Sequence, residues 1–471
     1  MKNSTQKTIK KETLCVVGLG YVGLTLATIF AEEGVPIIGV DYNESIIDAL
    51  ENGLPHFYEP GLEEKLAENK ERMMFTTSIA DAREATSFII SVGSNVDKDG
   101  KPDYTHVESS SKAIGGILKP GDIVILRSTV TMGTTRKRVT PILEQVSGLK
   151  AGKDFFVAFV PERTIEGKAL EELRTLPQVV AGLNRESRDI AAALFARFSP
   201  NIVLVDELEE AELVKLISNA YRDLTFAFAN SVALIASEHN VNVNTAIEAA
   251  NEGYARNRIP LPSPGVGGYC LTKDPLLLAH GTLKYFDAGE LLRQGRVVNK
   301  LMTSHIADIA NSFTKQFHTH KEPHVVVVGL AFKGSPSTSD VRFSPSEMLI
   351  HDLRERGITK ISGYDLHLLP EVFGGWGIGR VEQEDHIAQS GNIVILMHRH
   401  ESYYDHERIL MDISKERNVK LVIDPWGMYN QGRDAILSKG IAYANLGFRS
   451  FLFPTHRILP AINASRSRLF L

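Results

Sequence analysis

Short apolar runs alternate with amphipathic helical patterns along most of the chain. Strands that are covered on both faces carry continuous apolar residues, so each of these runs predicts a buried strand. In the N-terminal part the runs are Leu14–Val17, Val35–Val40, Ser87–Val92, Ile123–Leu126 and Phe155–Val160. Because helical patterns separate them, they predict a doubly wound parallel sheet that ends near residue 205.

The middle of the chain has a different period. From Glu207 to Asn240 the apolar positions recur with the spacing of one long helix, and helical patterns continue to about Phe317. Strand patterns then return at His324–Val328, Ile361–Asp365, Asn392–Leu396 and Val419–Asp424. The chain is therefore predicted to be α/β, with two doubly wound parallel-sheet domains joined by a long central helix and a helical segment. The expected limits are 12–206, 207–318 and 319–447, followed by a tail at 448–471.

Charge and composition narrow the class of partner. The 471 residues carry a formal net charge of -5, which gives no basic field for nucleic acid or for an anionic membrane. The polar, lysine-rich segment Met1–Thr13 precedes an apolar run that glycines soon interrupt, so we expect neither a signal peptide nor a membrane span. The two cysteines, Cys15 and Cys270, lie in unrelated patterns, which favours a reducing, cytoplasmic setting.

The first strand leads into a glycine-rich turn. Gly18, Gly20 and Gly23 form G-x-G-x-x-G before a helical pattern, and Asp41 ends the next strand. In this context the glycines admit a pyrophosphate and the acid binds ribose hydroxyls, which predicts a dinucleotide-binding, Rossmann-like domain. A carboxylate at position 41 would repel a 2′-phosphate, so NAD is favoured over NADP.

Cys270 is the candidate nucleophile. It follows a glycine-rich stretch (Gly265, Gly267, Gly268) and precedes Lys273, Asp274 and Pro275. We expect a helix to start at Asp274 and Pro275, which would put the thiol near a helix N-terminus. That position and Lys273 would lower the pKa of the thiol. The alternative is a buried structural cysteine in a tight turn.

Further polar residues stand where this chemistry could use them. Thr129 follows the Ile123–Leu126 strand, and Glu162 and Glu166 follow the Phe155–Val160 strand, at the edge where such sheets bind ligands. Lys215 and Asn219 are four residues apart in the long helix and share one face. Taken singly, each of these residues could equally be an ordinary solvated side chain.

Together these motifs resemble the nucleotide-sugar 6-dehydrogenase family, which includes the UDP-glucose, GDP-mannose and UDP-N-acetylhexosamine dehydrogenases. The resemblance covers roughly residues 12 to 430. It rests on GLGYVG at 18–23, STV at 128–130, PERTIEG at 161–167, Lys215 with Asn219, GVGGYCLTKD at 265–274, and GLAFKG with SDVR at 339–342. It implies an N-terminal NAD domain, a dimerising central helix and a C-terminal domain that holds UDP.

The resemblance also implies a reaction, in which the C6 alcohol of the sugar is oxidised twice to the uronic acid with two NAD+ and one water. Cys270 would form a thiohemiacetal and then a thioester, because an aldehyde gives up a hydride only after a nucleophile has added. The catalytic residues carried over are Cys270, Lys215, Asn219, Asp274, Glu162 and Thr129. The cofactor residues are Gly18, Gly20, Tyr21, Val22, Gly23, Asp41, Ser94, Thr129, Glu166, Lys273 and Arg342. The substrate residues are Glu162, Glu166, Lys215, Asn219, Arg258, Gly267 and Lys333.

Some positions depart from the family pattern. Val92-Gly93-Ser94-Asn95 replaces the usual Val-Pro-Thr-Pro, so Ser94 takes the place of the cofactor-binding threonine. The run from Lys333 to Arg342 is about two residues longer than in the family. Pro264-Gly-Val-Gly-Gly is similar to the N-acetylhexosamine branch, whereas Cys270-Leu-Thr-Lys-Asp is similar to UDP-glucose enzymes. We expect a UDP-N-acetylhexosamine as substrate, with UDP-glucose as the alternative.

The resemblance extends to partners and leaves two other classes for comparison. It implies a homodimer through the central helix, with Arg258, or Arg256 if the loop is shifted, reaching the partner's sugar pocket, and a role in supplying polysaccharide precursors. No metal is expected. A two-electron β-hydroxyacid dehydrogenase would need neither Cys270 nor the second sheet domain, and a non-enzymatic NAD sensor would leave the catalytic group unexplained.

Overall fold

The computed structural model describes residues 12–97, 100–256, 258–281, 284–316, 322–399, 418–430, 432–447 and 449–450. The chain divides into two compact units. The first holds the segment up to Arg222 together with Cys270–Gln294 and Pro336–Ser339, and the second holds Asp223–Tyr269, Gly295–Ser335 and the chain from Asp340 onward. The division into three parts with limits at 206 and 318 stays a prediction.

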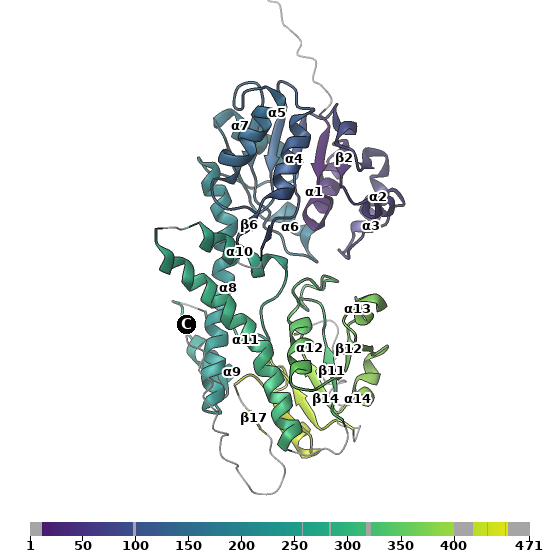
Figure 1. Ribbon diagram of the computed structural model, residues 1–471, viewed down its shortest axis with the longest axis vertical. Coiled ribbons are helices and arrows are strands. Elements are labelled where there is room, and N and C mark those ends of the chain that lie inside the picture. Colours follow the sequence, from purple (N-terminus) through teal and green to yellow (C-terminus); the bar gives the residue numbers. More distant parts are fainter. Residues whose placement is uncertain are drawn as a thin grey trace, which may run out of the picture. The chain divides into compact units, whose positions relative to one another are not determined.

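The first unit, coloured mainly purple and blue in Figure 1, is built on a sheet. This sheet has eight strands among the described residues, in the order β10-β9-β8-β7-β4-β1-β2-β3. The strands are β1 (Leu14–Val17), β2 (Ile37–Val40), β3 (Met73–Thr76), β4 (Ser87–Ile90), β7 (Ile123–Leu126), β8 (Phe156–Phe159), β9 (Gln178–Gly182) and β10 (Ile202–Leu204). All five predicted strands of this part are confirmed.

One edge of this sheet differs from the expectation of a wholly parallel sheet. The pairs from β3 across to β8 are parallel, but β9 runs antiparallel to β8, with Ala158 opposite Gly182. Because β9 runs opposite to β8, it starts at the carboxyl edge of the sheet, where β8 ends, and needs no crossover connection. The short strands β5 (Asn95–Val96) and β6 (Pro102–Asp103) form a separate antiparallel pair.

Helices cover both faces of the sheet (Figure 1). They are α1 (Tyr21–Glu32), α2 (Glu44–Glu51), α3 (Leu62–Glu68), α4 (Thr105–Gly115), α5 (Thr140–Ser147), α6 (Ala169–Thr175) and α7 (Arg185–Phe195). Apolar residues of α1, α2, α3, α6 and α7 pack on one face, and those of α4 and α5 pack on the other.

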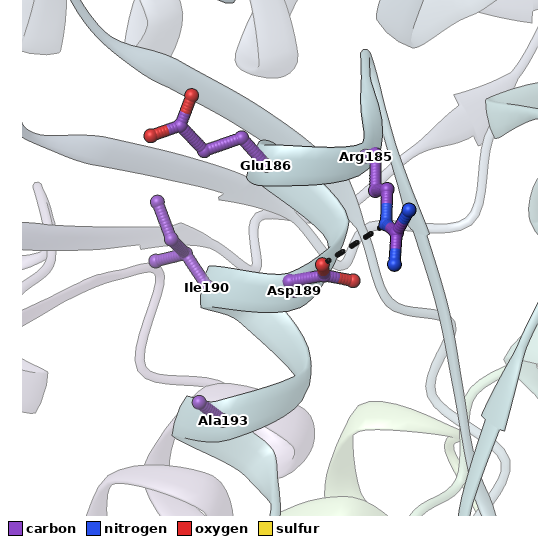
Figure 2. Close-up of a pocket in the computed structure, with 5 residues that line it drawn as sticks. All are labelled: Arg185, Glu186, Asp189, Ile190 and Ala193. Carbon is purple, nitrogen blue, oxygen red and sulfur yellow. Dashed lines mark ion pairs between the residues drawn. The ribbon is translucent and has the colours of Figure 1, made fainter.

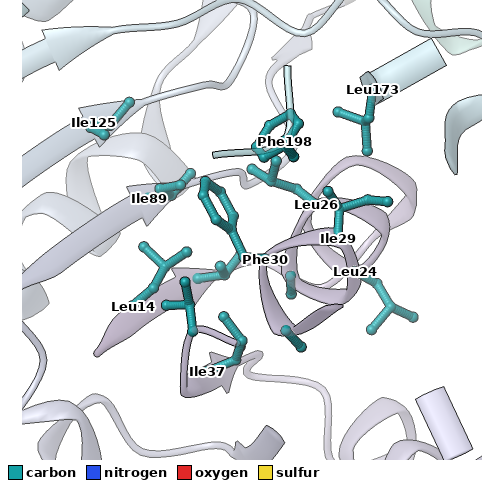
Figure 3. Packing of buried hydrophobic residues seen from close by; sticks show 14 of the residues in the cluster. Leu14, Leu24, Leu26, Ile29, Phe30, Ile37, Ile89, Ile125, Leu173 and Phe198 are labelled. Atoms are coloured by element: carbon teal, nitrogen blue, oxygen red, sulfur yellow. The ribbon is translucent and has the colours of Figure 1, made fainter. Parts of the chain in front are cut away.

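Successive residues of each strand enter different cores. In β1, Leu14 belongs to the cluster of Figure 3 and Cys15 belongs to the cluster on the opposite face. Phe30 of α1 fills the first cluster and meets Phe195 and Phe198 edge to face, at centroid distances of 5.7 and 5.0 Å. Because both faces are apolar, polar side chains gather at the carboxyl edge of the strands.

The strand order sets the place of a ligand crevice. From β1 the chain proceeds to β2 and β3 on one side, and from β4 it proceeds to β7 and β8 on the other. The loops after β1 and β4 therefore leave in opposite directions, and such a switch point opens a crevice at the carboxyl ends of the two strands.

The second unit repeats this plan with seven strands among its described residues, in the order β13-β12-β11-β14-β15-β16-β17 (Figure 1). The strands are β11 (His324–Val328), β12 (Lys360–Tyr364), β13 (Gly379–Arg380), β14 (Ile393–Leu396), β15 (Leu421–Ile423), β16 (Ala442–Ala444) and β17 (Arg449–Ser450). Only β17 pairs antiparallel among them. The accompanying helices are α12 (Pro345–Glu355), α13 (Pro370–Gly375), α14 (Ile387–Ser390) and α16 (Arg433–Ser438). The predicted second sheet domain is confirmed.

The middle of the chain is helical, as its period predicts. It forms α8 (Leu208–Glu238), α9 (Val243–Asn251), α10 (Tyr269–His280) and α11 (Phe286–Gln316). The predicted start of α10 at Asp274 and Pro275 is wrong, because the helix already begins at Tyr269 and contains Pro275. Within the described part of the chain, no helix is long and apolar enough to cross a membrane.

Candidate active site

The glycine turn after β1 is fixed by close packing. Gly18 has φ +92°, and a Cβ there would lie 2.8 Å from the carbonyl oxygen of Ser91. A Cβ on Gly23 would lie 1.8 Å from the carbonyl oxygen of Gly18. Around Gly20, by contrast, a Cβ would meet nothing within 4 Å. The outer glycines are therefore required by the fold, and Gly20 faces open space in which a ligand can approach the backbone.

Asp41 joins the end of β2 to this turn. Its Oδ2 accepts a hydrogen bond from the backbone N–H of Leu19 at 2.8 Å, and its Oδ1 accepts one from Asn43 at 3.0 Å. The side chain is buried, and the two bonds fix its orientation beside the turn. A carboxylate oxygen can accept more than one hydrogen bond, so ribose hydroxyls can still bind to it.

Helix α1 begins directly after the turn, at Tyr21 and Val22, and its N-cap residue Gly20 supplies no side-chain cap. The first amides of a helix have no partner within the helix and carry a partial positive charge. Open space at Gly20, this helix start and the carboxylate of Asp41 together fit a dinucleotide with free ribose hydroxyls.

Cys270 lies in the first turn of α10, as predicted for a thiol near a helix N-terminus, and it is exposed. Lys273 and Asp274 follow it by three and four residues and lie on the same face of the helix. Both are buried. The alternative that Cys270 is a buried structural cysteine is therefore wrong. Cys15 is the buried cysteine of the two and lies in the core.

The carboxylate of Asp274 connects several of the predicted residues. Its Oδ1 pairs with the Lys273 ammonium at 2.7 Å, and its Oδ2 accepts a hydrogen bond from the Asn219 amide at 2.5 Å. Lys273 also donates to the Ser94 hydroxyl at 3.3 Å. Residues from α8, α10 and the loop after β4 thus share one network inside the first unit.

Lys215 stands apart from that network. Its side chain is buried, with 7% exposure, yet among the described residues its ammonium has no hydrogen bond or ion pair. Its charge acts to lower the pKa of both Cys270 and Glu162. A largely buried cation that lacks a donor–acceptor partner is well suited to receive an anionic group.

The pKa of the Cys270 thiol moves opposite to our expectation. Loss of surrounding water raises it, and the Asp274 carboxylate adds to that effect, whereas Lys215 and Lys273 act in the lowering direction. Contact with water on one side does not fully solvate a thiolate, because the solvation of a charge depends on water over several ångströms. The Lys273 charge is also engaged by Asp274, so the predicted lowering is wrong.

The two glutamates of the loop after β8 have different surroundings. Glu162 is buried against Arg127, which follows β7, and the two form an ion pair. Glu166 is half-buried and accepts a hydrogen bond from the Thr338 hydroxyl at 3.3 Å. Thr129 is half-buried in the loop after β7. All of these residues belong to the first unit.

Five predicted residues belong to the second unit. Gly267 packs so tightly that a Cβ would lie 2.4 Å from the carbonyl oxygen of Phe343. Arg342 has its guanidinium paired with Asp340. The other three are the half-buried Lys333 and the exposed Arg256 and Arg258.

Three residues that are not among the predicted site residues contact the loop after β8 or the residues beside it. Arg127 forms an ion pair with Glu162 and donates hydrogen bonds to Gln178, and Glu59 accepts hydrogen bonds from the amides of Gly167 and Ala169, at 2.6 Å each. A charged residue directly after a buried strand marked Arg127 as unusual, but its partner cannot be read from the chain. No sequence signal marks Glu59 or Gln178.

A shallow depression lies elsewhere on the first unit, along α7 (Figure 2). Its lining side chains all come from that one helix, where Arg185 and Asp189 form an ion pair at 3.6 Å. None of the five lining residues belongs to the predicted site.

Comparison with known proteins agrees with this geometry. Residues 12–199 match the model of the UDP-glucose/GDP-mannose dehydrogenase family, NAD binding domain, and residues 209–301 match the central domain of the same family. The chain belongs to this family. It is an NAD-dependent nucleotide-sugar dehydrogenase, which confirms the predictions of enzyme class and cofactor.

Individual relatives of this dehydrogenase carry related names. The chain is 33% identical over 75% of its length to the UDP-N-acetyl-D-mannosamine dehydrogenase of Pyrococcus horikoshii, covering 83% of that protein. It is 30% identical over 89% of its length to the NDP-N-acetyl-D-galactosaminuronic acid dehydrogenase of Ralstonia solanacearum, covering 97% of it. Its fold is similar to the solved UDP-D-ManNAc dehydrogenase of P. horikoshii, with TM-score 0.80, 28% identity, and coverage of 92% of this chain and 99% of the other.

Replacing Asp41 with alanine should weaken NAD binding by roughly 10- to 100-fold, because a hydrogen bond to a charged group contributes about 1.5–3 kcal/mol. It should also reduce discrimination against NADP, since the repulsion of a 2′-phosphate is removed. Titration calorimetry with both cofactors measures the two effects.

Asp365 offers a matched control. Its Oδ2 accepts hydrogen bonds from the amides of Leu330 and Ala331, at 2.8 and 3.1 Å, in the second sheet. Asp365→Ala removes the same kind of turn contact and should leave both cofactor affinities unchanged. Equal effects of the two substitutions would show that Asp41 acts only on the fold.

Proposed function

We propose that this enzyme oxidises the C6 hydroxyl of a UDP-N-acetylhexosamine, UDP-GlcNAc or UDP-ManNAc, to the uronic acid through a thioester on Cys270. The observation that carries the proposal is the exposed thiol in the first turn of α10, within electrostatic range of the Lys215 ammonium. The product would serve as a polysaccharide precursor.

The proposed chemistry explains why a cysteine stands at this position. NAD+, when bound, accepts one hydride in each of the two oxidations. After the first, the sulfur of Cys270 forms a bond to the aldehyde carbon, and the thiol proton passes to the new hydroxyl or to water. The thiohemiacetal then loses its hydride and its hydroxyl proton, which leaves a thioester. Water cleaves the carbon–sulfur bond, so that the uronate and the free thiol are formed.

Lys215 and Asn219 are the proposed donors to the oxygen of these adducts. Preorganised donors that face a developing negative charge lower the barrier of such steps. Lys215 supplies a buried cation without a competing hydrogen bond among the described residues. Asn219 donates to the Asp274 carboxylate, which fixes the direction of its amide. Asp274 and Thr129 are proposed to hold the water, and Glu162 to assist its attack on the thioester.

The cofactor and substrate residues follow the same proposal. Amides of the glycine turn and of Tyr21 and Val22 would bind the pyrophosphate, and Asp41 would bind the ribose. The further proposed contacts to NAD are Ser94, Thr129, Glu166, Lys273 and Arg342. Glu162, Glu166, Lys215 and Asn219 would contact the sugar end of the substrate, with Gly267 and Lys333 binding its nucleotide end.

The choice of sugar rests on the loop before Cys270 and on the names of the relatives described above. Pro264-Gly-Val-Gly-Gly is similar to the N-acetylhexosamine branch, and both relatives act, by name, on N-acetylated sugars. UDP-glucose is the alternative, favoured by Lys273 directly before Asp274. Initial rates with UDP-N-acetylglucosamine, UDP-N-acetylmannosamine and UDP-glucose test the choice, and a clear preference for UDP-glucose would refute it.

An apolar stripe on α8 supports a homodimer. Ile217, Tyr221, Phe228 and Ile235 are 47%, 72%, 56% and 62% exposed. Positions four, eleven and eighteen residues apart return to nearly the same side of a helix, so these side chains form one narrow line. Large apolar side chains in a row on a surface mark an interaction site. We propose that the same stripe of a second copy covers it.

Arg258 is proposed to complete the sugar pocket of the partner. It is exposed and stands at the end of a loop that Asn251 closes by two hydrogen bonds to the backbone of Ile259, at 2.8 and 2.9 Å. A guanidinium presents a rigid fork of donors that suits a polar sugar and its carboxylate product. The guanidinium of Arg256, by contrast, lies over the ring of Tyr254, with Cζ 5.2 Å from the ring centroid.

Cys270→Ser should reduce steady-state NADH formation by more than about 10³-fold, in line with the loss of other catalytic nucleophiles, and should leave NAD binding intact. The wild type should yield two NADH per sugar. One NADH per sugar would indicate a two-electron hydroxyacid-type reaction, and none would indicate a sensor.

Cys15 gives the control for this experiment. Burial raises the pKa of its thiol to about 12, so iodoacetamide should label Cys270 alone, with loss of activity, and should label nothing in Cys270→Ser. Near-normal turnover in Cys270→Ser would contradict the thioester mechanism.

Phe228→Glu should dissociate the proposed dimer, because a charge in an apolar seam stays unpaired when buried. Light scattering should give twice 52.0 kDa for the wild type and the single mass for the variant. Leu366→Glu, at a residue of the second unit with 60% exposure, is the control and should remain dimeric. A dimeric Phe228→Glu protein would rule out this stripe.

Arg258→Ala should raise KM for the nucleotide sugar by roughly 10- to 100-fold, the cost of a lost hydrogen bond to a charged group, with KM for NAD unchanged. Arg256→Ala should have little effect. Mixed dimers of Arg258→Ala with Cys270→Ser test the action across subunits. If Arg258 acts in the partner's pocket, one pocket of the mixed dimer has both defects and the other has neither, so the second pocket stays active. If it acts in its own subunit, each pocket has one defect. If Arg256→Ala raises KM and Arg258→Ala does not, Arg256 is the arginine that reaches the partner's pocket.

A further inference from the structure

Arg127 is a fully buried cation beside the proposed catalytic residues. It directly follows β7, its exposure is 1%, and it is among the largest fully buried side chains described. Removing a charge from water is unfavourable unless hydrogen bonds and an opposite charge replace the lost solvent. The groups that replace water around the guanidinium therefore indicate its role.

The guanidinium is directed at one carboxylate oxygen. Its Nε donates to Oε2 of Glu162 at 3.0 Å, and its Nη2 donates to the same oxygen. The remaining donors face the backbone carbonyl of Val160 at 3.4 Å and the side-chain oxygen of Gln178 at 3.4 and 3.5 Å. The ring of Phe195 lies against the guanidinium, with its centroid 5.2 Å from Cζ. Arg127 is thus held on every side.

The other oxygen of Glu162 is engaged as well. Oε1 accepts hydrogen bonds from the backbone amides of Arg163 and Thr164, at 2.6 Å each. Each carboxylate oxygen therefore accepts two N–H donors, an arrangement that favours the ionised form and one orientation. Such a carboxylate is held in one orientation in the loop after β8.

Two charges act on this carboxylate among the described groups, Arg127 from the end of β7 and Lys215 from α8. Burial raises the pKa of Glu162, but Arg127, the amide of Thr164 and Lys215 outweigh burial and lower the pKa below its usual value. Without Arg127 the burial effect would remain, and the carboxylate would lose its strongest partner.

We propose that Arg127 is a positioning residue for the reaction, which fixes the Glu162 carboxylate in its ionised form facing the Lys215 charge. This inference rests on the proposed function, because it concerns the same catalytic group. It also assigns Glu162 an electrostatic part: a fixed negative charge beside the buried cation that faces the reacting oxygen. Gln178 accepts hydrogen bonds from both terminal nitrogens of the guanidinium and so helps to hold it in place.

Arg127→Gln tests the proposal through the pH profile of kcat. With the guanidinium removed, burial raises the pKa of Glu162, so the variant should lose activity at acidic and neutral pH and recover as pH rises. We expect its acidic limb at least about one pH unit above that of the wild type, a tenfold change in the protonation equilibrium, with KM for NAD unchanged. Arg127→Lys keeps the positive charge but loses the two-donor geometry of the guanidinium. It should therefore have the acidic limb of the wild type, with a lower kcat.

A second measurement is independent of turnover. In the wild type the pKa of Glu162 is lowered, so its contribution to stability is present at neutral pH and is lost as pH falls through that pKa. In Arg127→Gln the pKa is raised, and the sign reverses: the folded state should lose stability as pH rises. Chemical unfolding between pH 5 and 9 distinguishes the two. Arg138→Gln, which breaks an exposed pair with Glu108, should keep both wild-type profiles.

Glu162→Gln completes the test and keeps it decisive if Arg127→Gln folds poorly. When Arg127 acts only through Glu162, the double variant Arg127→Gln/Glu162→Gln should match the kcat of Glu162→Gln within about twofold. It should fold, since both members of the buried ion pair are removed together. Wild-type pH profiles in Arg127→Gln, or a further loss in the double variant, would overturn the inference. Failure of the proposed function would appear instead in the wild type, as fewer than two NADH per sugar.

Discussion

A charge that leaves water must find its partners inside the protein, and this constraint shapes the carboxyl edge of the first sheet. Removing one partner of a buried ion pair costs about 3–5 kcal/mol of stability, so both partners must be present in the folded protein. Arg127 meets Glu162, and Lys273 meets Asp274. The first pair joins the loops after β7 and β8. The second is formed by neighbours in α10, which connect to α8 through Asn219 and to the loop after β4 through Ser94.

The two sheets share one way of holding the turn that follows their first strand. In each, the strand next to the glycine turn ends in an aspartate whose carboxylate accepts hydrogen bonds from amides of that turn: Asp41 with Leu19, and Asp365 with Leu330 and Ala331. The continuation differs. Helix α1 begins three residues after Gly18, whereas the chain after Gly329 forms a loop before α12 begins at Pro345. Of these two turns, only the first has the amides of a helix start beside its glycines, which agrees with the absence of G-x-G-x-x-G from the second.

The surroundings of Cys270 combine opposing effects. A helix N-terminus and two lysines favour the thiolate, yet limited solvation and the carboxylate of Asp274 raise the pKa of the thiol. Limited solvation and Asp274 outweigh the lysines, so the pKa of this exposed thiol lies above its ordinary value. Lys215, the first of the two lysines, is buried and has no hydrogen bond or ion pair among the described residues.

Much of the architecture was determined by the sequence itself. Continuous apolar runs predicted the five strands from Leu14 to Val160, the long period predicted α8, and the turn from Gly18 to Gly23 with Asp41 predicted the cofactor. These features are local, because strand burial, helix period and positive φ depend on neighbours in the chain. The start of α10 was misjudged at Pro275, since a proline inside a helix is tolerated where tertiary packing supports it.

Only the tertiary structure decided the partners. No spacing in the chain indicates that Arg127 meets Glu162 and Gln178, that Glu59 holds the amides of Gly167 and Ala169, or that β9 returns antiparallel to β8. The direction of the Cys270 pKa shift was missed for the same reason. Solvation and charge pairing depend on all atoms within several ångströms, and those atoms come from segments that only the fold brings together.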